Sequence, residues 1–374
     1  MAPDYKIPTL RDALPFWASL ALIPVLAFAI WFGSWTIALV PFSTWFLFAL
    51  LDQAIGKTRE NIDPNSPESG LFWYRLITRI WPPTQIGVLL VTLWYVPQAA
   101  HLSAVEKLGV YFGVGVITGT IGINYAHELM HQRSRMDRWL ADILLASVFY
   151  SHFRSEHLLV HHRYVGTPRD PVTARYGESF FRFFSRVLPG CLLSALKAEA
   201  RLQDRVGRPA WHRSNPFWRY AALQAVTLGV AALLGGWWGV ALVLFQGFVS
   251  IWQLELVNYV EHYGLERRYI GDGKYEPVGP RHSWNATYQA SNWLLINLQR
   301  HSDHHFNPTR PFPLLQSGDP DETPELPYGY PVMTTAAMVP PLWHRIMSPR
   351  VKAWRKHFYP DVSDWAALPR PMPR

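Results

Sequence analysis

Six long apolar stretches constrain the fold of this chain more than any other feature of its sequence. They run approximately over residues 14–32, 36–55, 83–100, 108–125, 217–234 and 237–260. A helix needs about 20 mostly apolar residues to cross a hydrocarbon layer of about 30 Å. Because 49% of the residues are hydrophobic and only 17% are charged, a water-soluble globule is excluded. The sequence predicts an all-α membrane protein with six transmembrane helices and no cleaved signal peptide.

The net charge of +8 is unevenly distributed, and this predicts an orientation. Fifteen Lys or Arg residues lie from Gln132 through Arg219, with Arg219 included, whereas the links between stretches three and four and between five and six hold almost none. The positive-inside rule then puts the basic segment and both termini in the cytoplasm. We expect one integral-membrane domain over residues 1–374, with cytoplasmic blocks at about 126–216 and 261–374. No nucleic-acid-binding module accompanies the basic segment, so nucleic acid is not an expected partner.

The last block is rich in proline and aromatic residues. We expect it to cover the cytoplasmic end of the bundle, with short helices near 337–347 and 351–357. Cys191 is the only cysteine. The sequence therefore excludes a disulfide framework, a zinc site built from cysteines and an internal iron–sulfur centre.

Nine of the fifteen histidines fall into four tight groups at or beyond the predicted cytoplasmic ends of the helices. They are His127 and His131 in H-E-L-M-H, His157, His161 and His162 in E-H-L-L-V-H-H, His262 in N-Y-V-E-H-Y-G-L, and His301, His304 and His305 in R-H-S-D-H-H. Many imidazoles packed together without metal would compete for too few hydrogen-bond partners. We therefore predict that these nine bind metal. The other six lack this spacing and are expected to be structural: His101, His152, His212, His282, His344 and His357.

The spacing within each group suggests how its members are shared between ions. His127 and His131 are four residues apart, which puts both rings on one face of an α-helix. By the same rule His157 pairs with His161, and His162 points about 100° away toward a second ion. The spacing of three between His301 and His304 predicts the same arrangement for the last group.

The number of histidines indicates two metal ions with four or five nitrogens each, since one zinc site uses three or four ligands. Imidazole suits iron, copper, nickel and zinc alike, so the choice rests on chemistry. A di-iron centre activates O2, and a site at the end of an apolar bundle is within reach of lipid-dissolved substrate. H-E-L-M-H also fits an intramembrane zinc metalloprotease with Glu128 as general base, but this leaves seven grouped histidines without a task. A metal transporter would need polar ligands within the spans.

These motifs resemble those of the integral-membrane di-iron oxygenases, and within them the bacterial alkane hydroxylases. The resemblance rests on H-E-L-M-H-Q, E-H-L-L-V-H-H-R-Y-V-G-T-P-R-D-P, N-Y-V-E-H-Y-G-L, H-S-W-N and L-Q-R-H-S-D-H-H-F-N-P-T-R, and extends from about residue 40 to 352. It implies a bacterial cytoplasmic-membrane enzyme with two irons on nine histidines and O2 as oxidant. It further implies electrons from a rubredoxin or ferredoxin-type donor that a NAD(P)H-dependent reductase reduces. The expected reaction is terminal hydroxylation of an alkane to a primary alcohol.

Departures from the family pattern at Met130, Gln132 and Phe306 lie beside the histidines, where they would reshape access. The substrate therefore stays open between alkanes and methyl-aromatics, and a fatty-acyl desaturase or hydroxylase would use the same irons. A pocket discriminates by only about 1–3 kcal/mol per methylene, so a range of chain lengths is expected.

Acidic residues interleave with the histidines. Glu128, Glu156, Glu261 and Asp303, and with them Asp170 and Glu178, are candidates to accept hydrogen bonds from ligand N–H groups, or else to pair with nearby arginines.

The chain has no nucleotide-binding glycine motif, flavin site or cysteine cluster, so another protein must supply electrons. The basic segment, with Arg133, Arg135, Arg201, Arg205 and Arg208, is the predicted docking surface.

Overall fold

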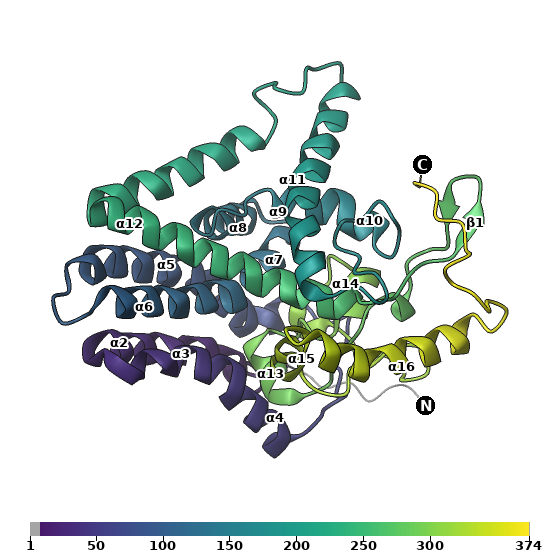
Figure 1. Ribbon diagram of the computed structural model, residues 1–374, viewed down its shortest axis with the longest axis horizontal. Coiled ribbons are helices and arrows are strands. Elements are labelled where there is room, and N and C mark those ends of the chain that lie inside the picture. The colour runs from purple at the N-terminus through teal and green to yellow at the C-terminus, as the bar shows by residue number, and fades with distance from the viewer. Residues whose placement is uncertain (1–7, 374) are drawn as a thin grey trace.

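The long apolar stretches are helical in the computed structural model, which describes residues 8–373. In a hydrocarbon layer every backbone N–H and C=O must be paired within the protein, and a helix achieves this within one segment. Among the described residues, five helical stretches are long and apolar enough to cross a membrane: Leu10–Phe32, Ser34–Ile55, Glu68–Gln98, Ala104–His131 and Phe217–His262. They lie side by side in Figure 1, and most of the remaining chain gathers at their right-hand end.

Most of these stretches combine several helical forms. The first consists of α1 (Leu10–Ala13), η1 (Leu14–Ala21) and α2 (Leu22–Phe32); the second of η2 (Ser34–Ala38), α3 (Leu39–Phe42), η3 (Ser43–Leu47) and α4 (Phe48–Ile55); the third of η4 (Glu68–Leu71), α5 (Phe72–Tyr95) and η5 (Val96–Gln98); the fourth of α6 (Ala104–Ile117), η6 (Thr118–Ile123) and α7 (Asn124–His131); the fifth of α12 (Phe217–His262). Large apolar side chains on them face outward, with Leu233 83% and Trp237 90% exposed. Such a surface suits lipid rather than water, and the protein is a multi-pass membrane protein.

The helix α12 contains both of the last two predicted spans. Its 46 residues would extend about 69 Å if straight, but Gly236 has φ 58° and ψ −150°. At that residue α12 folds back into two arms (Figure 1). The predicted spans 217–234 and 237–260 are these two arms.

The third span begins earlier than predicted. The α-helix α5 starts at Phe72 and continues through Pro82 and Pro83, whereas the sequence suggested a start at residue 83. Proline removes a backbone hydrogen bond from a helix interior, but transmembrane helices tolerate it where neighbouring groups compensate. The predicted start coincides with the second of these prolines, and both lie inside the helix.

The two remaining blocks form further helices and one small hairpin. They are α8 (Arg135–Ser147), α9 (Phe153–Glu156), η7 (His157–His161), α10 (His162–Tyr164), α11 (Phe180–Asp204), β1 (Tyr269–Gly271), β2 (Lys274–Tyr275), η8 (Pro280–His282), α13 (Gln289–Leu294), α14 (His301–Phe306), η9 (Phe312–Leu314), α15 (Tyr330–Ala337) and α16 (Pro340–Phe358). The antiparallel hairpin β1–β2 is the one sheet among the described residues, so the all-α prediction is right but for this small element. The two short helices expected near 337–347 and 351–357 are one helix, α16, which continues through Pro349.

An aromatic core holds the end of α12 in place. The ring of Tyr259 lies 5.2 Å from that of Trp343 in α16 and 5.5 Å from that of Phe183 in α11, measured between centroids. Tyr263 lies 5.3 Å from Trp343. These contacts fix the turn of α12 that carries His262.

Candidate metal centre

The nine clustered histidines come from five elements that meet at one end of the bundle. The helix α7 supplies two, η7 with the start of α10 supplies three, the last residue of α12 supplies one, and α14 supplies three. They form two groups in which one ring nitrogen of each member lies within 4.8 Å of those of the others. The first group is His127, His131, His157, His162 and His304, and the second is His161, His262, His301 and His305.

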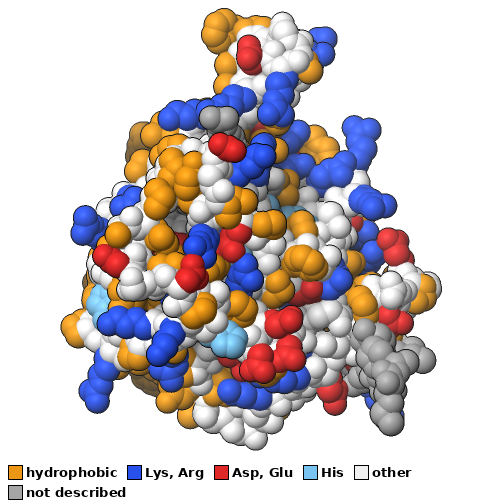
Figure 2. Space-filling view, turned by 90° about the vertical axis from the view of Figure 1, so that its right-hand side faces the viewer, with side chains coloured by type: hydrophobic (Ala, Val, Ile, Leu, Met, Phe, Trp, Pro, Cys, Tyr) orange, Lys and Arg blue, Asp and Glu red, His pale blue; other side chains and the backbone are white. Residues whose placement is uncertain are grey.

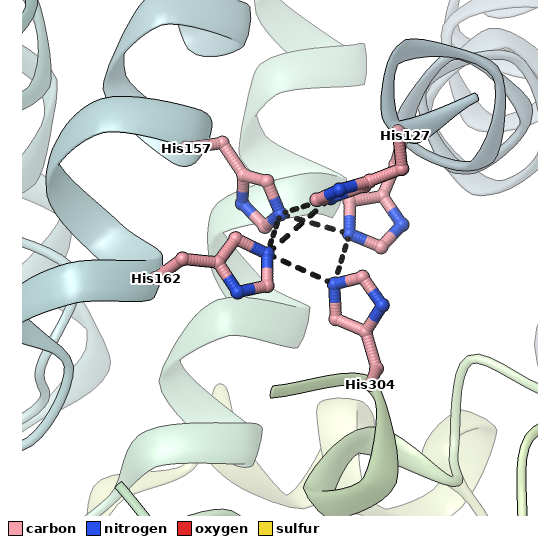
Figure 3. Close-up of side chains that lie close together, drawn as sticks. His127, His157, His162 and His304 are labelled. Carbon is pink, nitrogen blue, oxygen red and sulfur yellow. Dashed lines mark hydrogen bonds between the residues drawn. The ribbon is translucent and has the colours of Figure 1, made fainter. Parts of the chain in front are cut away.

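In the first group the ring nitrogens converge on one point (Figure 3). The Nε2 atom of His127 lies 3.0 Å from those of His157 and His304, and the Nε2 atoms of His157 and His162 are 2.9 Å apart. A neutral imidazole carries one N–H, so these Nε2 atoms cannot all be satisfied by one another. Nitrogens bound to one metal at about 2.0–2.1 Å lie roughly 3 Å apart. The separations therefore fit a shared ion.

The second group has the same character. The Nε2 atoms of His301 and His262 are 3.2 Å apart, and those of His305 and His301 are 3.0 Å apart. His161 donates from Nδ1 to Asp170 Oδ2, which leaves its buried Nε2 without a partner among the described residues. An unpaired buried nitrogen is expensive, and a metal ion would satisfy it. Both donor sets fit a metal centre.

The sharing of histidines within η7 differs from the prediction. We expected His157 to pair with His161, but His157 lies in the first group with His162, and His161 lies in the second. The reason is that η7 is a π-helix, in which the N–H of His162 bonds to the carbonyl of His157. The hydrogen bond then spans five residues instead of four, which turns position 162 toward the face that carries His157.

The prediction for α14 was wrong in the same way. His301 lies with His305 in the second group, and His304 lies in the first. Spacings of three and four both bring residues to one face of a helix, so the sequence could not choose between them. The predicted sharing within α7 is confirmed, because His127 and His131 are in one group.

Burial favours the uncharged form of His157 and His304. Burial, reinforced by the neighbouring imidazoles, holds the pKa of His157 and of His304 well below the ordinary value. A neutral imidazole offers its lone pair to a metal, so the desolvated site favours the ligand form.

Two of the six candidate carboxylates contact the histidines. Asp170 Oδ2 lies 3.1 Å from His161 Nδ1, and Glu261 Oε2 lies 3.3 Å from His301 Nε2. Glu128 instead accepts from the Gln132 amide and the Phe312 N–H.

The other three lie near the centre without touching an imidazole in a hydrogen bond. Asp303 pairs with Arg310, and Glu178 pairs with Arg186. Glu156 is fully buried, and neither of its oxygens has a hydrogen-bond partner among the described residues. Burial raises its pKa well above the ordinary value, so this carboxyl group is uncharged.

The six remaining histidines lie outside both groups. His101 bonds to Ile30 O, His212 to Ser214, His282 to Glu276 and Tyr359, and His344 to Tyr263, while His152 packs on Tyr150 and His357 on Trp354.

A narrow, mostly apolar cavity leads from the histidines into the bundle. Its inner end is lined by His127 and His157 of the first group and by His301 of the second. From there it continues between η3, η6 and the second arm of α12, where Trp45 and Gln253 line it. Apolar periodicity alone did not single out these two residues. Phe306, considered as an access residue, is 60% exposed and does not line the cavity.

Comparison with known proteins adds independent support. A fatty acid desaturase family model matches residues 105–337, which include all nine clustered histidines. Alkane 1-monooxygenase 2 of Pseudomonas aeruginosa is 37% identical over 82% of each chain, and alkane 1-monooxygenase 1 of that species is 34% identical over 91% of each. The hydroxylase component of a xylene/toluene monooxygenase from Pseudomonas putida is 27% identical over 68% of this chain and 67% of its own.

Proposed function

This chain belongs to the fatty acid desaturase family and, within it, to the alkane 1-monooxygenases. On that basis we propose that it hydroxylates the terminal carbon of an alkyl hydrocarbon. An R–CH3 group, O2, two electrons and two protons give R–CH2OH and water. One C–H bond and the O–O bond break, and a C–O bond forms. The observation that carries the proposal is the apolar cavity that ends at both histidine groups.

We propose iron for both sites, with five histidines for the first ion and four for the second. Bound there, the two ions supply the activation of O2 that an unreactive C–H bond requires. The chain's own groups orient the ligands: the Asp170 carboxylate holds the Nδ1 side of His161, which turns Nε2 toward its three partners. The carboxylate of Glu261 lies instead against Nε2 of His301, the ring nitrogen that faces the other histidines of the second group, so it would stand beside the second ion.

The cavity would act on the substrate by position alone. An alkane offers no polar group to hold, so walls such as Leu254, Val257 and Leu294 must align the chain and exclude water. The open inner end presents one terminal carbon beside His127 and His301.

The test uses purified protein reconstituted with iron, a reduced electron donor and a panel of alkanes. Two irons per chain and a primary alcohol as product are expected. A double bond in a fatty-acyl chain as the product would contradict the proposal and favour a desaturase, and benzylic alcohols with no alkanol would favour a methyl-aromatic substrate. Peptide cleavage dependent on Glu128 would favour the zinc protease.

We further propose that an acidic electron-carrier protein, a rubredoxin or ferredoxin-type donor reduced by a NAD(P)H-dependent reductase, docks in a basic cleft beside η7. The cleft has a volume of about 1950 Å³ and reaches Leu158 and Leu159, between the η7 histidines. Two rows of exposed cations face it, Lys197, Arg201 and Arg205 along α11 and Lys352 and Lys356 along α16. Figure 2 shows Lys and Arg side chains spread over this end of the molecule. Arg133, Arg135 and Arg208 do not line the cleft.

The same basic end suggests the orientation. We propose six crossings of the bacterial cytoplasmic membrane, counting the arms of α12 separately, with both termini and the metal centre on the cytoplasmic side.

A further inference from the structure

In the side-chain amide of Gln253 the oxygen has a hydrogen-bond partner and the nitrogen has none among the described residues. The indole Nε1–H of Trp45 donates to Gln253 Oε1 at 3.2 Å. An indole N–H only donates, which fixes the amide's orientation and leaves Nε2 as the free end. That nitrogen is fully buried and has no hydrogen-bond acceptor among the described residues, and the side chain is 7% exposed.

Neighbouring polar groups on the same helices are already occupied. Thr118 donates to Gln246 Oε1 and bonds to Ser250 Oγ, and the Gln246 amide donates to Ser147 O. This network lies one to two turns earlier in α12, and its members bond to one another and to Ser147. The free amide of Gln253 therefore stands apart from it.

Gln253 lines the apolar cavity that ends at the histidines. The distance from Gln253 to the metal centre can be followed along two neighbouring segments, because Gly119 packs against Gln253. Gly119 precedes His127 by eight residues, and Gln253 precedes Glu261 by eight. At 1.5 Å per residue both separations are roughly 12 Å. An alkyl substrate of medium chain length would therefore reach from the Gln253 amide to the metal centre.

A buried donor without an acceptor destabilises the native state, and a native structure that keeps one calls for an explanation. We propose that Gln253 donates to an oxygen carried by the substrate, so that the enzyme prefers alkyl chains with an ether, ester or hydroxyl oxygen at the end opposite the hydroxylated methyl. This inference rests on the proposed terminal hydroxylation and narrows its substrate class. The substrate's own oxygen is unchanged in the reaction.

The experiment compares decane with octyl methyl ether, which has the same number of heavy atoms and differs by one CH2-to-oxygen exchange. The ratio of kcat/KM for ether over decane is measured for the wild type, Gln253→Leu and Gln253→Met. One added hydrogen bond predicts a ratio about fivefold higher in the wild type than in either variant. The expected product carries its new hydroxyl on the octyl end.

Leu254→Met is the matched control, because it alters an apolar wall of the same cavity and leaves the amide and its indole donor in place. It should keep the preference for the ether. An unchanged ratio in both Gln253 variants would overturn the inference, as would formaldehyde from the methoxy group as the main product, since that puts the oxygen at the metal end.

Binding is measured in parallel as the shift in thermal unfolding that each compound causes. A larger shift with ether than with decane is expected in the wild type and not in the Gln253 variants, and equal shifts would count against the inference. If the wild type turns over neither compound, the proposed function fails, while these shifts still decide whether Gln253 recognises an oxygen.

Discussion

At the scale of single residues, the side chains around the histidines decide which ring nitrogen is free. Asp170 Oδ2 lies against His161 Nδ1, and Asp170 Oδ1 accepts the N–H of Val172. With both oxygens used as acceptors, the carboxylate selects the tautomer that carries its proton on Nδ1. The ring's free lone pair is then on Nε2, which faces the other histidines of the second group.

Asp170→Asn should therefore weaken the second site specifically. The asparagine oxygen can keep the Val172 bond, but its NH2 then faces Nδ1 and favours the tautomer with a protonated Nε2. Loss of such a partner lowers metal affinity by about 10–100-fold. Metal per chain, measured after graded chelation, should fall from two toward one.

Glu178→Gln is the control, since Glu178 pairs with Arg186 and contacts no histidine. Retention of two tightly bound metals in Asp170→Asn would show that this carboxylate does not orient a ligand.

The lowered pKa values of His157 and His304 predict a metal centre that resists acid. These groups are neutral above their folded-state pKa, which lies well below 6.5, so protons compete for the lone pairs only at still lower pH. Metal content after dialysis should be level from pH 8 to pH 6 and decline below that range. A decline centred at 6.5 would indicate solvated, unshifted imidazoles.

At the scale of elements, glycine at the helix breaks sets how the arms turn. Gly33, between the first two stretches, has φ 61° and ψ −153°, almost the angles of Gly236. This backbone region is accessible essentially only to glycine. The same backbone conformation therefore joins the first stretch to the second and the first arm of α12 to its second arm.

Gly236→Ala should destabilise the protein by about 1–3 kcal/mol. A Cβ at position 236 would meet nothing within 4 Å, so the cost is backbone strain alone. Thermal unfolding in detergent measures it.

Gly229→Ala is the matched control in the same helix. It also has open space around its Cβ, and its ordinary helical backbone predicts a gain of roughly 0.5–1 kcal/mol. Equal stability of the two variants would contradict the role given to Gly236.

At the scale of the whole molecule, the cleft at the basic end predicts how the donor protein is recognised. The double variant Lys197→Glu/Arg201→Glu should raise the KM for the reduced donor several-fold and leave metal content unchanged. The wild-type rate should fall with salt, because exposed charges are screened over about 10 Å at 0.1 M.

The double variant Arg133→Glu/Arg135→Glu makes the same change in charge away from the cleft. It should have little effect on the KM for the reduced donor. Equal effects of the two double variants would reject the cleft as the docking site in favour of net charge alone.

Cysteine labelling can test the orientation of the protein in the membrane. The single native cysteine, Cys191, is buried and should not react with the label. Arg205→Cys should react only from the cytoplasmic side, and Val105→Cys, in a residue 78% exposed, only from outside. Labels at 140 and 365 should also report cytoplasm. Reaction of Arg205→Cys from outside would invert the topology.

The amino-acid sequence by itself determined the apolar helices and the nine histidines that converge. Hydrophobic length is a local property, and lipid leaves a backbone few alternatives to the helix. Four histidine motifs with close internal spacing likewise left little doubt that a metal centre exists.

Tertiary structure alone decided how those histidines are divided and what they face. The π-turn of η7 brings His162 beside His157 by changing the angle per residue, and α14 lies between the groups and gives rings to both. Spacings of three, four and five can each align two side chains, and the surrounding packing selects among them. The free amide of Gln253 follows from its contact with Trp45, 208 residues earlier in the chain, and no local pattern in the sequence records such a contact.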